Sequence, residues 1–164
     1  MITLKRILVP TDYSETSEVA VKYAIELSKA FNASLHVLHV LDRREPLESD
    51  LAFPLGLDGE AEAEARKRLR TAMSEETSKT LKSPEFVLRG GSAVSEIVRY
   101  AKERDVDLIV MGTHGRGVVA HGFMGSVAEK VVRTAPCPVL TVHHPQHEFI
   151  MPGAAEEQRS QAAH

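Results

Sequence analysis

The stretch from Asp107 to Thr134 concentrates the residues best suited to holding a phosphate group. It opens with a short apolar run from Leu108 to Met111, which has the pattern of a buried strand, and it ends in a helical pattern. Between the two lies a loop with five glycines: Gly112, Gly115, Gly117, Gly122 and Gly125. A parallel strand that leads through a glycine-rich loop into a helix brings backbone N–H groups and the positive end of a helix dipole to one place. The sequence therefore predicts a phosphate site in this loop.

Two common phosphate motifs can be tested against the same loop. Gly117 and Gly122 have the spacing of a P-loop, but Phe123-Met124 stand where a P-loop needs Lys and then Ser or Thr. A P-loop is therefore excluded. Residues 115–120 fit the dinucleotide pattern G-x-G-x-x-[GA], yet the next apolar run, at residues 139–142, is not followed by an acidic residue that would hold a ribose. A dinucleotide fingerprint is therefore disfavoured.

A third spacing does match. Gly112-x-x-Gly115, nine residues and then Gly125-Ser126 fit G-x2-G-x9-G-[ST], so the chain resembles the nucleotide-binding members of the universal stress protein family. The resemblance runs over about residues 1–143 and includes ILVPTD at 7–12, VLHV at 37–40 and PCPVL at 136–140. It implies an ATP-binding stress-response or regulatory protein whose phosphates are held by the 112–126 loop.

Three glycines and one helix start have clear physical roles at such a site. Gly112, Gly115 and Gly125 let the backbone approach a phosphate without a Cβ in the way. The N–H groups of Ser126 and Val127, together with the Ser126 hydroxyl, are expected to donate to phosphate. The helix end adds about 0.3–1 kcal/mol per charge.

Asp12 follows the first predicted strand, at the edge where open α/β sheets bind ligands. The resemblance implies that Asp12 contacts ribose or a bridging metal and that the Val40 main chain reads the adenine edge. The alternative for Asp12 is a cap at the start of the next helix. The expected ligand is ATP, or else AMP or ADP, with Mg or Mn. The residues expected to bind it are Pro10, Thr11, Asp12, Val40, Met111, Gly112, His114, Gly115, Arg116, Gly125, Ser126 and Val127.

No catalytic residue can be assigned from the sequence. A nucleotide hydrolase needs a positioned base and charge stabilisation of the transferring group, and neither a P-loop lysine nor a carboxylate pair stands beside the loop. His114 could act as a general base, but a single histidine in a glycine loop is more often a binding residue. We therefore expect a regulatory module with at most slow hydrolysis. The alternative is an enzyme of the same scaffold that hydrolyses ATP or transfers an adenylyl or phosphoryl group.

Hydrophobic periodicity predicts the elements that must position these residues. The predicted strands are residues 4–9, 34–41, 85–88, 107–111 and 138–142, and the predicted helices are 14–31, 59–81, one from 92 and one from 126 to 134. Strands that alternate with helices predict a doubly wound α/β fold, a single sheet with helices on both faces. The resemblance implies a five-stranded parallel sheet in the order 3-2-1-4-5, in which Asp12 and the 112–126 loop meet at one crevice.

Local patterns predict how the last two helices begin. Ser92 is expected to cap the helix after the Gly90-Gly91 turn. Ser126 stands three residues before Glu129, which predicts a capping box. The inward face of the last helix is expected to consist of Val127, Val131 and Val132.

Histidines and the cysteine give no metal site. His36 and His39 have an odd spacing, so they should face opposite sides of their strand. The cluster at residues 143–147 has three histidines but no cysteine and no helical spacing, which suggests adventitious metal binding at most. Cys137, between two prolines, is interpreted as a structural thiol.

Composition indicates one globular domain. The 164 residues are 43% hydrophobic and 26% charged, and a chain of that length buries roughly 70% of its unfolded surface. Residues 1–143 are expected to form the nucleotide-binding domain, and residues 144–164 a disordered tail. Residues 42–58 hold two prolines, one glycine and several acids without any period, so they are expected to form either a lid over the nucleotide or a mobile surface crossover.

Charge and hydropathy also limit the classes of partner and the cellular location that can be expected. A net charge of -3 provides no general field that attracts nucleic acid. The N-terminal apolar run is too short for a signal peptide or a membrane span, and one cysteine fits a reducing compartment, so a cytoplasmic location is expected. The last strand, Pro138 to Val142, offers an apolar edge without lysine. The resemblance implies a homodimer through this strand; the alternative is that the tail or the last helix covers it.

Overall fold

The computed structural model describes residues 1–41, 67, 81–113 and 124–143. The predicted loop at residues 42–58, most of the predicted helix at 59–81 and the predicted tail at 144–164 lie outside the described residues.

Five parallel strands form one sheet. They are β1 (Arg6–Pro10), β2 (Ser34–Leu41), β3 (Lys82–Gly90), β4 (Leu108–Gly112) and β5 (Val139–Val142). Their order is β3-β2-β1-β4-β5, and every neighbouring pair is parallel. β1 and β4 lie side by side, with Ile7 opposite Leu108 and Leu8 opposite Ile109. The predicted fold class and strand order are confirmed, and the switch point of the sheet lies between β1 and β4.

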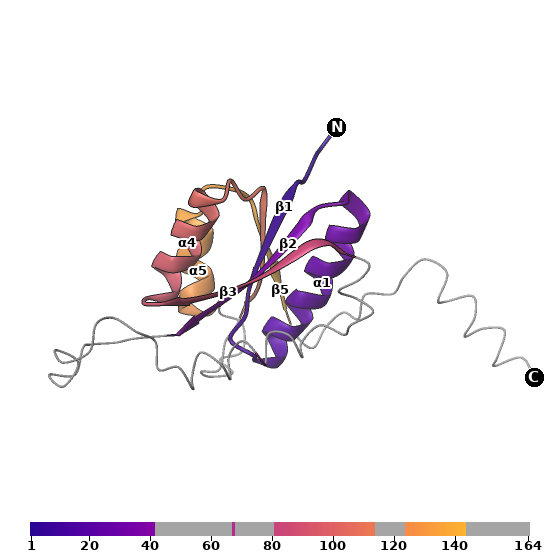
Figure 1. Ribbon diagram of the computed structural model, residues 1–164. Coiled ribbons are helices and arrows are strands. Elements are labelled where there is room, and N and C mark those ends of the chain that lie inside the picture. Colours follow the sequence, from indigo (N-terminus) through magenta and orange to yellow (C-terminus); the bar gives the residue numbers. More distant parts are fainter. Residues whose placement is uncertain (42–66, 68–80, 114–123, 144–164) are drawn as a thin grey trace, which may run out of the picture.

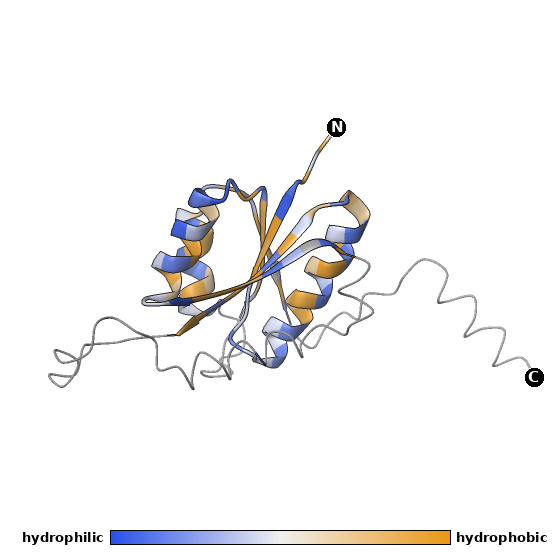
Figure 2. Ribbon diagram, in the orientation of Figure 1, coloured by the Kyte–Doolittle hydropathy of each residue, from blue (hydrophilic) through white to orange (hydrophobic). Residues whose placement is uncertain are grey.

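Helices cover both faces of the sheet. α1 (Glu15–Phe31) lies on one face, while α4 (Ala93–Glu103) and α5 (Ser126–Thr134) lie together on the other (Figure 1). Alternate residues of β1 divide between two cores, because Ile7 and Val9 pack with α1 whereas Leu8 packs with α4 and α5. Hydrophobic residues run along the central strands, and hydrophilic residues spread over the outer sides of the helices (Figure 2). No helix among the described residues combines the length and the apolar character that a membrane crossing requires.

α1 begins one residue later than predicted because Ser14 is its N-cap. The Ser14 side chain accepts a hydrogen bond from Ser17 N, and Glu15 lies in the first turn, where a negative charge is favourable. The helix ends at Asn32, whose φ of 52° is left-handed and whose N–H bonds back to the last turn. The buried stripe has helical spacing and consists of Ala20, Val21, Ala24 and Ile25.

The start of α5 differs from the prediction. Gly125 is the N-cap, and Ser126 is the first helical residue, so the predicted capping box at Ser126 is wrong. The predicted inward face is also partly wrong, because Val127 and Val132 are 37% and 45% exposed. The buried residues of α5 are Ala128 and Val131, three positions apart. Both pack in the core that α5 shares with α4 and the sheet.

β3 is longer than the predicted strand at 85–88. It pairs with β2 from Lys82 to Gly90, although Pro84 interrupts the pattern and the register shifts between Ser34 and His36. β3 is an edge strand of the described sheet, where a proline is tolerated because its missing N–H faces away from the ladder. Ser92 occupies the N-cap of α4 as predicted, but its side chain makes no cap hydrogen bond among the described residues.

Candidate functional site

The carboxyl ends of the central strands form one edge. β1 ends at Pro10 and the neighbouring β4 ends at Gly112. The chain stays attached to the sheet just beyond both ends, because Thr11 N donates to Leu38 O and Thr113 N donates to Val142 O, each at 2.9 Å. The predicted site residues at 10–12 and 111–112 are therefore brought together at the switch point, where open α/β sheets bind ligands.

Asp12 lies in a tight turn at the start of α1. Its Oδ1 accepts hydrogen bonds from Ser14 N at 3.0 Å and from Ser14 Oγ at 2.6 Å. Asp12 is therefore not itself the N-cap of α1. Ser14 is the N-cap, and Asp12 accepts hydrogen bonds from Ser14. The carboxylate thus lies beside the start of α1, where the helix dipole makes a negative charge favourable.

Gly112 is required by the packing of α1. A Cβ at Gly112 would lie 2.8 Å from Thr16 Cγ2, a distance that real Cβ atoms essentially never show, and 3.0 Å from the Thr16 carbonyl carbon, which is unusually tight. The sequence suggested that this glycine clears space for phosphate, and the structure adds a packing reason. β4 and the first turn of α1 can approach one another only because residue 112 has no side chain.

Gly125 closes the base of the glycine-rich loop. Its N–H donates to Thr113 O at 2.6 Å, so the two ends of the segment 114–123 are tied together. Its φ of −61° and ψ of 150° are open to any residue, so backbone conformation gives no reason for a glycine here. Among the described residues no side chain caps α5, and both Ser126 and Val127 are exposed at its first turn. The first N–H groups of a helix that lacks a side-chain cap are able to donate hydrogen bonds to an anion.

Three of the predicted phosphate contacts, His114, Gly115 and Arg116, lie outside the described residues. Two of the other predicted residues are placed chiefly by packing. Met111 is 5% exposed and packs in the core under α4 and α5, and Pro10 is the half-buried last residue of β1.

β2 continues beyond the end of β1 and places Val40 at the same edge of the sheet. Leu38 O accepts from Thr11 on the β1 side, whereas Leu41 O accepts from Gly91 on the β3 side. Main-chain groups of alternate residues in a parallel strand face the same neighbour. The N–H and C=O of Val40 therefore face the β1 side, two residues past the last pairing of Pro10 with Leu38.

The sequence profile of the universal stress protein family matches residues 3–143. The chain belongs to the universal stress protein family. A universal stress protein of Methanocaldococcus jannaschii is 38% identical over 148 residues, which cover 88% of this chain and 85% of the relative. A second universal stress protein of that organism is 32% identical over 155 residues, which cover 86% of this chain and 96% of the relative.

Solved universal stress proteins share the fold over most of the chain. A structure of the second Methanocaldococcus jannaschii protein gives a TM-score of 0.73 at 31% identity and covers 89% of this chain and 100% of its own. A universal stress protein in complex with cAMP gives 0.65 at 26% identity, over 87% of this chain and 98% of its own. One from Archaeoglobus fulgidus in complex with dAMP gives 0.57 at 25% identity, over 87% and 99%.

In this universal stress protein the two histidines of β2 do face opposite sides. His36 Nδ1 lies 2.7 Å from the Tyr100 hydroxyl on the α4 side, whereas His39 Nδ1 lies 2.8 Å from Thr11 O and the His39 ring lies 4.5 Å from that of Tyr13, on the α1 side. Burial lowers the pKa of His36, and burial raises the pKa of Tyr100. No group of three metal-ligating side chains occurs among the described residues.

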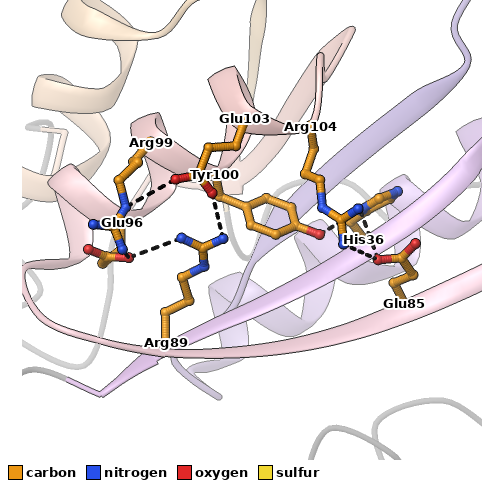
Figure 3. A network of polar contacts seen from close by, with 8 residues as sticks. All are labelled: His36, Glu85, Arg89, Glu96, Arg99, Tyr100, Glu103 and Arg104. Atoms are coloured by element: carbon orange, nitrogen blue, oxygen red, sulfur yellow. Dashed lines mark hydrogen bonds and ion pairs between the residues drawn. The ribbon is translucent and has the colours of Figure 1, made fainter. Parts of the chain in front are cut away.

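A polar network surrounds Tyr100 and joins β3 to α4 (Figure 3). The guanidinium carbons of Arg89 and Arg104 lie 5.0 and 5.8 Å from the ring centroid. Arg89 pairs with Glu103 at 2.7 Å, and Arg104 pairs with Glu85 at 3.2 Å. The network fastens the edge of the universal stress protein sheet to a helix, so we assign it a structural role.

Sequence reasoning missed three residues that support the site: Ser17, His39 and Thr113. Ser17 and Thr113 are common small polar residues, and His39 was considered only as a metal ligand. Asp107 was also missed: its Oδ2 accepts from Lys5 N at 2.7 Å and from Arg6 N at 2.9 Å, which fixes the start of β1. An aspartate directly before an apolar run was the available signal. Cys137 is half-buried, and burial raises its pKa, as expected of a structural thiol.

Proposed function

We propose that this universal stress protein binds an adenine nucleotide, with ATP as the ligand, in the crevice between the ends of β1 and β4. The observation that carries the proposal is a convergence at one sheet edge of three groups with different chemistry. They are the Asp12 carboxylate, the Val40 main chain and the start of α5, where no described side chain makes a cap hydrogen bond. Two structural neighbours are described in complex with cAMP and dAMP, which supports an adenine nucleotide.

Each group matches one part of the nucleotide. The Val40 N–H and C=O offer a donor and an acceptor, as the adenine edge requires. Asp12 accepts hydrogen bonds from ribose hydroxyls. The first-turn N–H groups at Ser126 and Val127 donate to phosphate, where the absent side chain of Gly125 leaves room. His114, Gly115 and Arg116 complete the proposed phosphate site.

A divalent cation is compatible with the residues present. Mg²⁺ is usually held by one or two carboxylates together with substrate phosphates and water. Asp12 would supply one such carboxylate at the ends of β1 and β4. The ion would neutralise charge on the bound phosphates.

We propose binding rather than catalysis as the main activity. Neither a P-loop lysine nor a carboxylate pair stands beside the loop, and Oδ1 of Asp12 already accepts two hydrogen bonds from Ser14. The proposal is therefore a regulatory nucleotide-binding protein with at most slow hydrolysis. Pairing of the β5 edge with a second copy is proposed as its assembly, since Leu140 is 38% exposed on that strand.

Titration calorimetry with ATP, ADP and AMP, each with and without Mg²⁺, tests the proposal. We expect saturable binding of one nucleotide per chain, and a product assay on the same samples should show little ADP over the time of the titration. Absence of binding by all three nucleotides at millimolar concentration would refute the proposed function. Multiple turnover within the titration would refute the non-catalytic part and favour the enzyme alternative.

A further inference from the structure

Thr11, directly after the end of β1, is buried and hydrogen-bonded through its main chain and its side chain. It is 7% exposed, and each of its polar atoms has a partner. Its N–H donates to Leu38 O, and its carbonyl lies 2.8 Å from His39 Nδ1. Its hydroxyl accepts from Tyr13 N at 3.1 Å and lies 3.1 Å from Ser17 Oγ. Thr11 is therefore hydrogen-bonded to β2 and to the first turn of α1.

The protons in this cluster can be assigned from the partners. Ser17 Oγ donates its single proton to Ser14 O at 2.9 Å, so the Thr11 hydroxyl must be the donor in the bond between Thr11 and Ser17. A carbonyl oxygen can only accept, so the His39 proton is on Nδ1. His39 thus donates to the peptide group that joins Thr11 to Asp12.

The two peptide groups on either side of Asp12 are both held in this way. His39 Nδ1 donates to the carbonyl of Thr11, which precedes Asp12. The N–H of Tyr13, which follows Asp12, donates to the Thr11 hydroxyl. Tyr13, the next residue, has a φ of 62°, a left-handed conformation that a bulky side chain rarely adopts. The surroundings must stabilise this turn, and the His39 ring contributes through its contact with Tyr13.

We infer that His39 is a positioning residue for the nucleotide, acting through Asp12. By fixing the Thr11–Asp12 peptide, His39 sets the direction in which the Asp12 carboxylate meets ribose or the metal ion. His39 immediately precedes Val40, so one strand end both reads the base through its main chain and orients the carboxylate through a side chain. This inference rests on the proposed function and adds a residue to it that does not touch the ligand.

Two substitutions separate the donor of His39 from its ring. His39→Phe keeps a ring beside Tyr13 but removes the donor, and loss of one hydrogen bond that orients Asp12 should weaken ATP binding about five- to tenfold. In His39→Asn the amide nitrogen Nδ2 is two bonds from Cβ, the same position as Nδ1 of histidine, and it carries N–H groups. This variant should therefore bind ATP with an affinity within about twofold of the wild type.

A double-mutant cycle tests whether the effect passes through Asp12. Asp12→Asn keeps an oxygen for Ser14 but removes the charge that ribose or metal requires. In the Asp12→Asn background, His39→Phe should change ATP affinity by less than about twofold, because interacting residues are not additive. Equal effects of His39→Phe in both backgrounds would overturn the positioning role.

His36→Phe is the matched control on the opposite face of β2. It removes a buried histidine contact with Tyr100 and should lower stability without changing ATP affinity. Failure of the wild type to bind ATP would refute the proposed function itself. Wild-type binding together with unchanged affinity in His39→Phe would refute only the role of His39.

Discussion

Gly112→Ala tests whether the first glycine of the loop serves packing. The added Cβ would meet Thr16 Cγ2 at 2.8 Å and the Thr16 carbonyl carbon and oxygen at 3.0 and 3.1 Å. The methyl group can rotate away, but the backbone atoms can move only if the first turn of α1 moves. Relief therefore requires a shift of the helix against β4.

The magnitude follows from two opposing effects. Overpacking of a well-packed core typically costs about 1–3 kcal/mol. Replacing glycine by alanine stabilises by roughly 0.4–1 kcal/mol through the unfolded chain. We expect a net loss of about 1–2 kcal/mol in the free energy of unfolding, which for a chain of this size lowers the Tm by roughly 2–8 °C.

Urea unfolding followed by circular dichroism measures this loss. Thr16→Ser removes the Cγ2 contact but leaves both backbone contacts, so in that background Gly112→Ala should cost less but still destabilise. Wild-type stability of Gly112→Ala would refute the packing argument. Full rescue by Thr16→Ser would show that the methyl group alone, and not the α1 backbone, sets the constraint.

Three further changes give distinct outcomes. Gly125→Val should abolish ATP binding in calorimetry, because the valine side chain would fill the space proposed for phosphate, while the Tm stays near that of the wild type, because φ of −61° and ψ of 150° suit valine. Unchanged affinity would contradict this phosphate site. Burial lowers the pKa of His36, although the charge of Glu85 acts in the opposite direction. As the pH falls, the unfolded chain therefore protonates this histidine before the folded protein does, and the free energy of unfolding should decrease below about pH 6.5. His36→Phe should flatten that part of the urea stability profile, and an equal slope in both proteins would rule out His36 as its source. Leu140→Lys with Thr141→Pro should convert a dimer into a monomer in light scattering, since proline removes a ladder donor at the β5 edge and lysine opposes its own copy; a wild-type monomer or an unchanged dimer would end the proposal of β5 pairing.

Much of the fold was readable from local patterns. Parallel strands buried on both faces are nearly continuous apolar runs, and those at 34–41 and 107–111 agree with β2 and β4 to within one residue. The ends of β3 were not readable, because Lys82 and Arg89 join the strand only through pairing with β2. Ser126 fits a capping box by spacing, yet Gly125 has the extended backbone of an N-cap and its carbonyl accepts from Glu129 N, so the N-cap lies one residue earlier.

The candidate site divides in the same way. Glycines and an aspartate at a strand end are visible in a sequence because their residue types limit what they can do. The contact of His39 with Thr11 joins residues 28 positions apart and depends on how far β2 extends past β1. The close approach of Gly112 to Thr16 likewise depends on the distance between two packed elements, which residue spacing does not specify.

Thr113 has a consequence for how this protein can be altered. Its carbonyl holds Gly125, its N–H is held by Val142, and its hydroxyl lies 3.0 Å from His143 Nδ1, so one residue fastens β4 to β5 and to the start of α5. For a loop whose two ends are held together, the entropic cost of closing the loop rises by only about 0.6 kcal/mol for each doubling of its length. The segment 114–123 can therefore be lengthened, or exchanged for that of a relative, while the sheet stays intact, so a chimera would show whether the nucleotide preference proposed above moves with this segment.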